Sequence, residues 1–249
     1  MVNPFSFFTY FGRYILFVAG MLTRPEAGRV FVRRVLDEMY VIGVGSLTIV
    51  AIISLFTGGV TTVQTGYQLV SNWISRTVIG SIVSDSVILE FAPTITSLVL
   101  AGKIGSSISS EIGTMRVTEQ IDALDVMGIN SASFLALPKI VAGLIMIPLL
   151  IIIAMGLGIT GGYIVGNAAG ILTPEQFVEG AQSSFRTFTL QFALIKSVTF
   201  AFIITSVSAF HGYFISGGAR EVGQASTRAV VYSCELILVF DYLLSQLLL

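Results

Sequence analysis

Two ionisable residues lie inside stretches of this sequence that are otherwise apolar. Glu90 precedes Phe91-Ala92-Pro93, and Lys196 is the only charged residue between Thr187 and Ala209. Ionised side chains within membrane-crossing helices are rare and face the protein interior or a cavity. The pair therefore predicts either a structural ion pair between two spans or a functional polar site, and the pattern leaves both open. Asp241, in the last apolar stretch, could pair or extend towards the interface, and the sequence does not place it.

A second stretch with chemical potential, Gly102 to Gly128, is polar and rich in acids. Its charged residues are Lys103, Glu111, Arg116, Glu119, Asp122 and Asp125. On one continuous helix, Glu111, Thr118, Asp122 and Asp125 share a face, and Val117, Ile121 and Leu124 lie nearly opposite. Each ionised side chain at the centre of a bilayer costs roughly 2.5–3.5 kcal/mol, so the segment must lie at the membrane surface or in water. The two-faced pattern favours a docking helix over a merely solvated connector.

The sequence contains no recognisable catalytic motif. A phosphate-binding loop ending at Gly102-Lys103 would need glycine where Ser97 stands and serine or threonine where Ile104 stands. The metalloprotease and nucleophile-elbow motifs are absent as well. A single histidine, His211, and a single cysteine, Cys234, exclude a disulfide framework and a multi-ligand His/Cys metal site. We therefore expect no catalytic residue, metal or cofactor.

The composition is that of a polytopic membrane protein. Of the 249 residues, 54% are hydrophobic and 11% are charged, where a soluble domain carries about 25% charged residues. The mean hydropathy is +0.90. The formal net charge of −1 gives no indication of a nucleic-acid partner. The length suits about five spans of roughly 20 residues each, together with one surface segment.

The hydrophobic pattern predicts an all-α fold with five spans. Residues 1–40 are aromatic and basic, which is typical of an amphipathic elbow lying in the membrane interface. The expected spans are residues 41–62, 82–101, 140–165, 187–209 and 229–249. Thr173–Arg186 reads as a polar helix outside the membrane, and residues 211–228 as a glycine-rich loop. Gly158, Gly161, Gly162 and Gly166 have the spacing of a close helix contact, although glycine is also simply tolerated in membrane helices.

Basic residues set the expected orientation. With the N-terminus inside, ten bases fall on the cytoplasmic side: Arg13, Arg24, Arg29, Arg33, Arg34, Lys103, Arg116, Lys139, Arg220 and Arg228. Only Arg76 and Arg186 fall outside. This bias predicts a cytoplasmic docking segment and a C-terminus on the outer side.

Several motifs carry a resemblance to a known family. Residues 101–106 read A-G-K-I-G-S, and residues 111–128 read E-I-G-T-M-R-V-T-E-Q-I-D-A-L-D-V-M-G. Together with L-E-F-A-P at 89–93, I-K-S at 195–197, F-H-G-Y at 210–213 and V-G-Q-A-S-T-R-A-V-V at 222–231, they resemble the MlaE (YrbE-type) permeases of MCE-associated ABC transporters. The resemblance covers essentially the whole chain. One departure is Lys103, where many members carry arginine, and the cation is kept.

The resemblance implies an architecture and partners that spacing alone does not show. It implies a single permease domain over residues 1–249, with the elbow at 1–40, a five-span bundle at 41–249 and a coupling helix at about 109–127. It also implies a homodimer in the inner membrane of a Gram-negative-type bacterium, a cytoplasmic ABC ATPase on the coupling helix, a periplasmic MCE-domain protein and often a STAS-domain protein. The implied cargo is phospholipid, moved between the inner membrane and the periplasmic route to the outer membrane.

The resemblance also guides the choice of site residues. For ATPase coupling we expect Glu111, Met115, Arg116, Glu119, Asp122 and Asp125. For an outward-open lipid cavity we expect apolar walls from Phe56, Val60 and Val63, a headgroup contact at Tyr67, and Glu90 with Lys196 beside the cavity.

Two other functions compete with this interpretation. A proton-driven secondary transporter could use Asp85, Glu90, Lys196 and Asp241 as a relay. It would leave the amphipathic segment unexplained, and no inverted repeat is visible. An intramembrane hydrolase is the third possibility, and the missing nucleophile–base pair argues against it.

Overall fold

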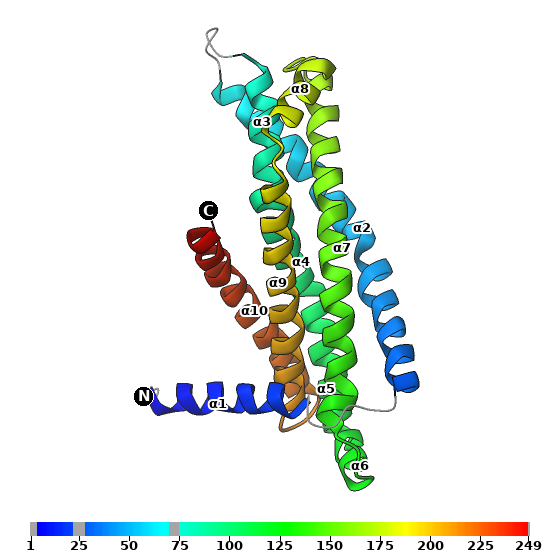
Figure 1. Cartoon of the computed structure of the whole chain (residues 1–249). Coiled ribbons are helices and arrows are strands. Elements are labelled where there is room, and N and C mark those ends of the chain that lie inside the picture. Colours follow the sequence, from blue (N-terminus) through cyan, green and yellow to red (C-terminus); the bar gives the residue numbers. More distant parts are fainter. Residues whose placement is uncertain (1–3, 22–27, 70–74, 249) are drawn as a thin grey trace. The chain divides into compact units, whose positions relative to one another are not determined.

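The computed structural model describes residues 4–21, 28–69 and 75–248, and within these ranges all regular structure is helical. Arg24, one of the bases that set the predicted orientation, lies outside the described residues. The elements in chain order are α1 (Pro4–Met21), α2 (Gly28–Gln68), α3 (Thr77–Ser86), η1 (Val87–Ile95), α4 (Thr96–Leu100), η2 (Ala101–Gly105), α5 (Ser106–Val117), α6 (Gln120–Val126), α7 (Ser131–Ala168), α8 (Pro174–Ser184), α9 (Thr187–Tyr213) and α10 (Ala219–Leu248) (Figure 1). The all-α prediction is confirmed.

Five stretches of the described chain are long and apolar enough to cross a membrane, as predicted. They are Gly28–Gln68, Thr77–Val117, Ser131–Ala168, Thr187–Tyr213 and Ala219–Leu248. The predicted polar helix outside the spans is also present, as α8. Its Thr173 side chain accepts a hydrogen bond from the Gln176 backbone N–H in a capping box, and Pro174 occupies the first turn.

One predicted boundary is wrong, and another stays a prediction. The elbow over residues 1–40 stays a prediction: α1 ends at Met21, and α2 runs from Gly28 to Gln68, since neither proline nor glycine interrupts the stretch before Gly43. The glycine-rich loop was expected over residues 211–228, but α9 continues to Tyr213 and α10 begins at Ala219. The Glu221 carboxylate accepts a hydrogen bond from the Gly218 backbone N–H at 2.9 Å, which satisfies a free donor at the start of α10.

The second span is not a regular α-helix. Residues Val87–Ile95 and Ala101–Gly105 are π-helical, and the first of these segments contains Glu90 and Pro93. Proline has no N–H, so Pro93 cannot donate the usual helical hydrogen bond to the carbonyl of Leu89. The Leu89 carbonyl also accepts a hydrogen bond from Lys196 Nζ at 3.3 Å. Such irregular turns are frequent at functional sites.

The chain divides into two compact units, which we describe separately. The first unit comprises residues 1–42, 100–145 and 201–236, and the second comprises residues 43–99, 146–200 and 237–249. In the first unit α1 packs on the end of α9 through aromatic rings: Phe210 contacts Tyr10, Tyr14 and Phe17 at centroid distances of 5.2, 5.5 and 5.8 Å. Tyr14 Oη also lies 2.7 Å from Ser206 Oγ, and burial raises the pKa of the Tyr14 hydroxyl, which keeps it protonated.

In the second unit, glycines allow α2 and α7 to approach closely. A Cβ built at Gly58 would overlap the backbone of Gly158, and one at Gly161 would overlap the carbonyl of Leu55. The glycine spacing that the sequence left open therefore marks a real helix–helix contact of the kind found in membranes.

This contact yields a stability prediction with a control on the same helix. Gly161→Ala should destabilise the protein by about 1–3 kcal/mol, because the new methyl group meets backbone that cannot rotate away. Gly156→Ala has open space around its Cβ and should be neutral or stabilising. Thermal unfolding of the purified protein measures both. Equal midpoints for the two variants would contradict the close α2–α7 contact.

Candidate functional site

The second unit contains a buried charged cluster centred on Lys196. Lys196 Nζ lies 2.7 Å from Glu90 Oε2 and 2.6 Å from Asp241 Oδ1. The predicted ion pair between Glu90 and Lys196 is therefore confirmed, and it is part of a three-residue cluster. The sequence located Asp241 in the last apolar stretch but did not predict its partner. The contact joins two helices that are far apart in the sequence, so residue spacing could not indicate it.

Neighbouring groups hold this charged cluster in place. Thr94 Oγ1 donates a hydrogen bond to Asp241 Oδ1 at 3.0 Å and lies one helical turn from Glu90. The ring of Phe192 lies 4.8 Å from Lys196 Nζ and adds a cation–π contact. The Lys196 ammonium is thus surrounded by two carboxylates, the Leu89 carbonyl and an aromatic face.

The three charged side chains differ in exposure, which decides how the cluster can be reached. The side chains of Lys196, Asp241 and Glu90 are 0%, 12% and 46% exposed. Lys196 and Asp241 form the closed part, and Glu90 is the side through which a ligand or proton would gain access. Breaking a buried pair by removing one member costs several kcal/mol, because the remaining charge has no compensation.

The predicted lipid-contacting residues lie along one exposed face of α2. Phe56, Val60, Val63 and Tyr67 follow a spacing of four, three and four residues, and all four side chains are exposed. No hydrogen bond, ion pair or ring contact within the described ranges joins this face to the charged cluster. The two predicted parts of the lipid site thus lie in one unit without direct contact.

The polar docking segment forms two helices, whereas the prediction of its faces assumed one continuous helix. Helix α5 ends at Val117, Glu119 adopts a left-handed backbone with φ of 61°, and α6 begins at Gln120. The hydroxyls of Thr114 and Thr118 bond back to the carbonyls of Ser110 and Thr114, which weakens the end of α5. The sequence has no glycine at this break, so its hydrophobic periodicity predicted one continuous helix across it.

The break changes the predicted faces only in part. Ile121 is buried, as expected for the apolar side, whereas Glu119, Asp122 and Asp125 are exposed. Arg116 pairs with Asp122 at 2.6 Å across the break, so these two residues hold α5 and α6 together. Glu119 and Asp125 have no such pair among the described residues and present their charges to solvent.

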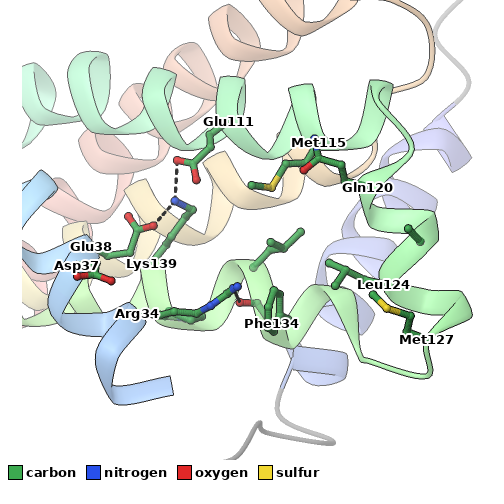
Figure 2. A pocket seen from close by; sticks show the side chains of 13 residues that line it. Arg34, Asp37, Glu38, Glu111, Met115, Gln120, Leu124, Met127, Phe134 and Lys139 are labelled. Atoms are coloured by element: carbon green, nitrogen blue, oxygen red, sulfur yellow. Dashed lines mark hydrogen bonds and ion pairs between the residues drawn. The ribbon is translucent and has the colours of Figure 1, made fainter. Parts of the chain in front are cut away.

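Beside α5 and α6 lies a cleft of about 430 Å³ that is also lined by α2 and α7 (Figure 2). Its floor is apolar and includes Met115, Leu124 and Phe134. Lys139, almost fully buried, bridges Glu38 of α2 at 2.5 Å and Glu111 of α5 at 2.8 Å. This bridge joins three helices that are far apart in the sequence, and nothing in the residue spacing indicated it.

Arg34 forms part of one wall of the cleft. Its guanidinium lies 3.3 Å above the ring of Phe134 and donates a hydrogen bond to the Phe134 carbonyl at 3.1 Å. The acids around the cleft, Asp37, Glu38 and Glu111, outnumber its bases, Arg34 and Lys139. An apolar floor with an acidic rim can accept an apolar side chain flanked by basic residues.

Of the six predicted coupling residues, the structure brings two into this cleft. Glu111 and Met115 line it, whereas Arg116, Glu119, Asp122 and Asp125 lie outside its lining. Sequence reasoning missed Val126 and Met127, which are 89% and 65% exposed at the end of α6. The available signal was the position of these two apolar residues directly after Asp125, the last acid of the polar segment.

Comparisons with known proteins point to one family. A family model described as Permease MlaE matches residues 35–247. A protein of Rickettsia bellii named a probable ABC transporter permease protein is 34% identical over 236 residues, covering 95% of this chain and 91% of that protein. The intermembrane phospholipid transport system permease protein MlaE of Haemophilus influenzae is 32% identical over 246 residues, covering 98% of this chain and 93% of that protein.

A plant protein is similar over most of the chain as well. The chloroplastic protein TRIGALACTOSYLDIACYLGLYCEROL 1 of Arabidopsis thaliana is 30% identical over 236 residues. These residues cover 94% of this chain and 67% of the plant protein.

The charged cluster predicts a specific pattern of stability. Lys196→Met leaves two carboxylates facing each other and should cost about 3–5 kcal/mol. The triple variant Lys196→Met, Glu90→Gln, Asp241→Asn contains no charge and should recover most of that loss. Unfolding midpoints and membrane abundance of both variants measure this.

Asp85→Asn, in the same span, is the control and should change neither quantity, because Asp85 forms no ion pair within the described residues. A triple variant that is less stable than Lys196→Met alone would show that charge compensation is not what holds the cluster.

Proposed function

Because the chain belongs to the MlaE permease family, we propose that it is the membrane-spanning permease subunit of an ATP-driven ABC transporter of phospholipids. Its transport would connect the inner membrane with a periplasmic MCE-protein route to the outer membrane. The observation that carries the proposal is the match over residues 35–247. It covers the docking segment and all five candidate spans, apart from the first seven residues of the first span and the last residue of the fifth. The chain itself is a non-catalytic transport subunit, and ATP hydrolysis belongs to a separate ATPase.

The acidic docking segment and its cleft are our candidate ATPase site. Glu119 and Asp125 provide exposed negative charge, and Val126 and Met127 provide an exposed apolar end. The cleft adds an apolar floor with an acidic rim. Such a surface suits a basic groove with an apolar pocket, which agrees with docking of a cytoplasmic protein through charge complementarity.

The face of α2 that contains Phe56, Val60, Val63 and Tyr67 is our candidate lipid wall. An exposed apolar face suits acyl chains, and the Tyr67 hydroxyl could meet a headgroup. We place this wall in a homodimer of single-domain permeases with the N-terminus cytoplasmic and the C-terminus periplasmic. A periplasmic MCE-domain protein and a STAS-domain protein complete the proposed assembly.

A proton-coupled transporter is disfavoured by the arrangement of its candidate relay. Glu90, Lys196 and Asp241 pair with one another, and Asp85 has no ion pair with any of them in the described chain, so the four residues do not form a continuous relay. The cluster is better suited to holding spans together.

The docking proposal predicts the effect of one exposed apolar residue. Val126→Asp should reduce co-purification of the ATPase at least about tenfold, because burying an unpaired carboxylate in an interface costs more than 1.4 kcal/mol. The matched control Val126→Leu keeps the apolar end and should bind as the wild type does. Yield and unfolding midpoint of the permease should not change in either variant. Wild-type ATPase recovery with Val126→Asp would remove α6 from the interface.

The acidic part of the docking surface is tested separately. Glu119→Lys with Asp125→Lys should abolish ATPase binding through like-charge contacts, which can cost several kcal/mol. Glu119→Gly removes one charge while suiting the left-handed backbone, so it should leave the α5–α6 break intact and weaken binding only slightly. Asp122 is left unchanged because it pairs with Arg116. Binding measured by pull-down at two salt concentrations should weaken with salt, and a salt-independent affinity would argue against a charge-based interface.

A further inference from the structure

The ion bridge at Lys139 joins the docking segment to the first membrane-crossing helix within one unit. Lys139 Nζ lies 2.8 Å from Glu111 Oε2 of α5 and 2.5 Å from Glu38 Oε1 of α2, and all three residues belong to the first unit. Figure 2 shows the ammonium group between the two carboxylates. The Lys139 side chain is only 4% exposed, so this chain covers the ammonium group without help from a second copy.

No other ion pair within the described ranges connects α5 with α2. The remaining pairs join α5 to α6, through Arg116 and Asp122, or lie in the cluster around Lys196. The charged link between the docking segment and the first span therefore passes through Lys139 alone.

The three members of the bridge differ in how easily a partner protein reaches them. The Glu111 side chain is 46% exposed, whereas Glu38 is 22% exposed. A basic side chain of a partner that enters the acidic cleft is attracted to Glu111, and there it competes with Lys139 for the carboxylate. A buried ammonium group needs an anionic partner, so Lys139 then depends on Glu38.

Glu38 belongs to the helix that also carries the candidate lipid wall. Helix α2 is continuous from Gly28 to Gln68, and the exposed face from Phe56 to Tyr67 lies in its second half. A change in how strongly Lys139 holds Glu38 therefore acts on the helix that we propose to contact lipid.

We propose that Lys139 is the positioning residue that couples the docked ATPase to α2. When a basic group of the ATPase binds Glu111, the Lys139–Glu111 pair weakens and the Lys139–Glu38 pair tightens. When that group withdraws, the bridge between the two acids forms again. The two pairing states differ in their contacts with the ATPase, so its cycle shifts the balance between them. This inference names a residue in the mechanism of the proposed function and therefore rests on it.

The test measures lipid transferred per ATP hydrolysed by full-length permease reconstituted with the ATPase and the MCE-domain protein. Glu38→Gln detaches α2 from the bridge and leaves Lys139 balanced by Glu111, so this ratio should fall roughly tenfold, as expected for the loss of one charge-assisted hydrogen bond. Asp37→Asn is the matched control, because Asp37 lines the same cleft on the same helix but forms no ion pair among the described residues. Both substitutions should weaken docking alike, and only Asp37→Asn should keep the wild-type ratio.

A second variant separates coupling from a merely structural role. Lys139→Met with Glu38→Gln leaves only Glu111, which is half-exposed and stays hydrated, so the unfolding midpoint should remain close to that of the wild type. The transfer ratio should nevertheless be as low as in Glu38→Gln. A structural brace alone would instead give a wild-type ratio in every variant that folds.

Two results would overturn the inference. One is a wild-type ratio in Glu38→Gln, and the other is an equal fall in Asp37→Asn, which would assign the effect to the charge of the cleft. Wild-type permease is measured in parallel. If it transfers no lipid with ATP, the proposed function fails and this inference fails with it, whereas ATP-driven transfer by the wild type and by Glu38→Gln at the same ratio removes this inference alone.

Discussion

The need to compensate one buried ammonium group determines much of the second unit. Lys196 is fully buried, so it requires anionic partners that spans elsewhere in the chain must supply. Glu90 does so from a π-helical segment that also contains Leu89, whose carbonyl accepts a hydrogen bond from the same ammonium group. Asp241 does so from α10, with Thr94 as its hydrogen-bond donor. The irregular second span and the position of the last helix within this unit follow from that single requirement.

A second buried lysine, Lys139, also joins helices through two carboxylates in the first unit. Lys139 joins α2, α5 and α7 through Glu38 and Glu111, beside a cleft with an apolar floor. The docking segment next to it keeps its charges exposed and its break fixed by the Arg116–Asp122 pair. A chain without a nucleotide-binding motif thus has a shaped surface with exposed acids, which we propose as the binding site of a separate ATPase.

The sequence predicted those features that depend on local composition. Long apolar stretches located the five spans, and two isolated charges within such stretches predicted the Glu90–Lys196 pair. Features that depend on distant contacts or on backbone detail were missed: Asp241 in the cluster, the Lys139 bridge, and the left-handed Glu119 between α5 and α6. The start of α10 at Ala219 was missed because Gly217 and Gly218 indicated a loop, which the prediction extended to residue 228. Glu221, which accepts a hydrogen bond from the Gly218 N–H, was the available signal for a helix start.

The central claim is that this chain moves phospholipid using energy from a docked ATPase. Its most direct test is lipid transfer from vesicles that contain the permease with the proposed ATPase and MCE-domain partners, measured with fluorescent phospholipid. Transfer should require hydrolysable ATP, should stop with Val126→Asp, and should be unaffected when a protonophore removes the proton gradient. Transfer that continues without ATP and disappears with the proton gradient would contradict the account.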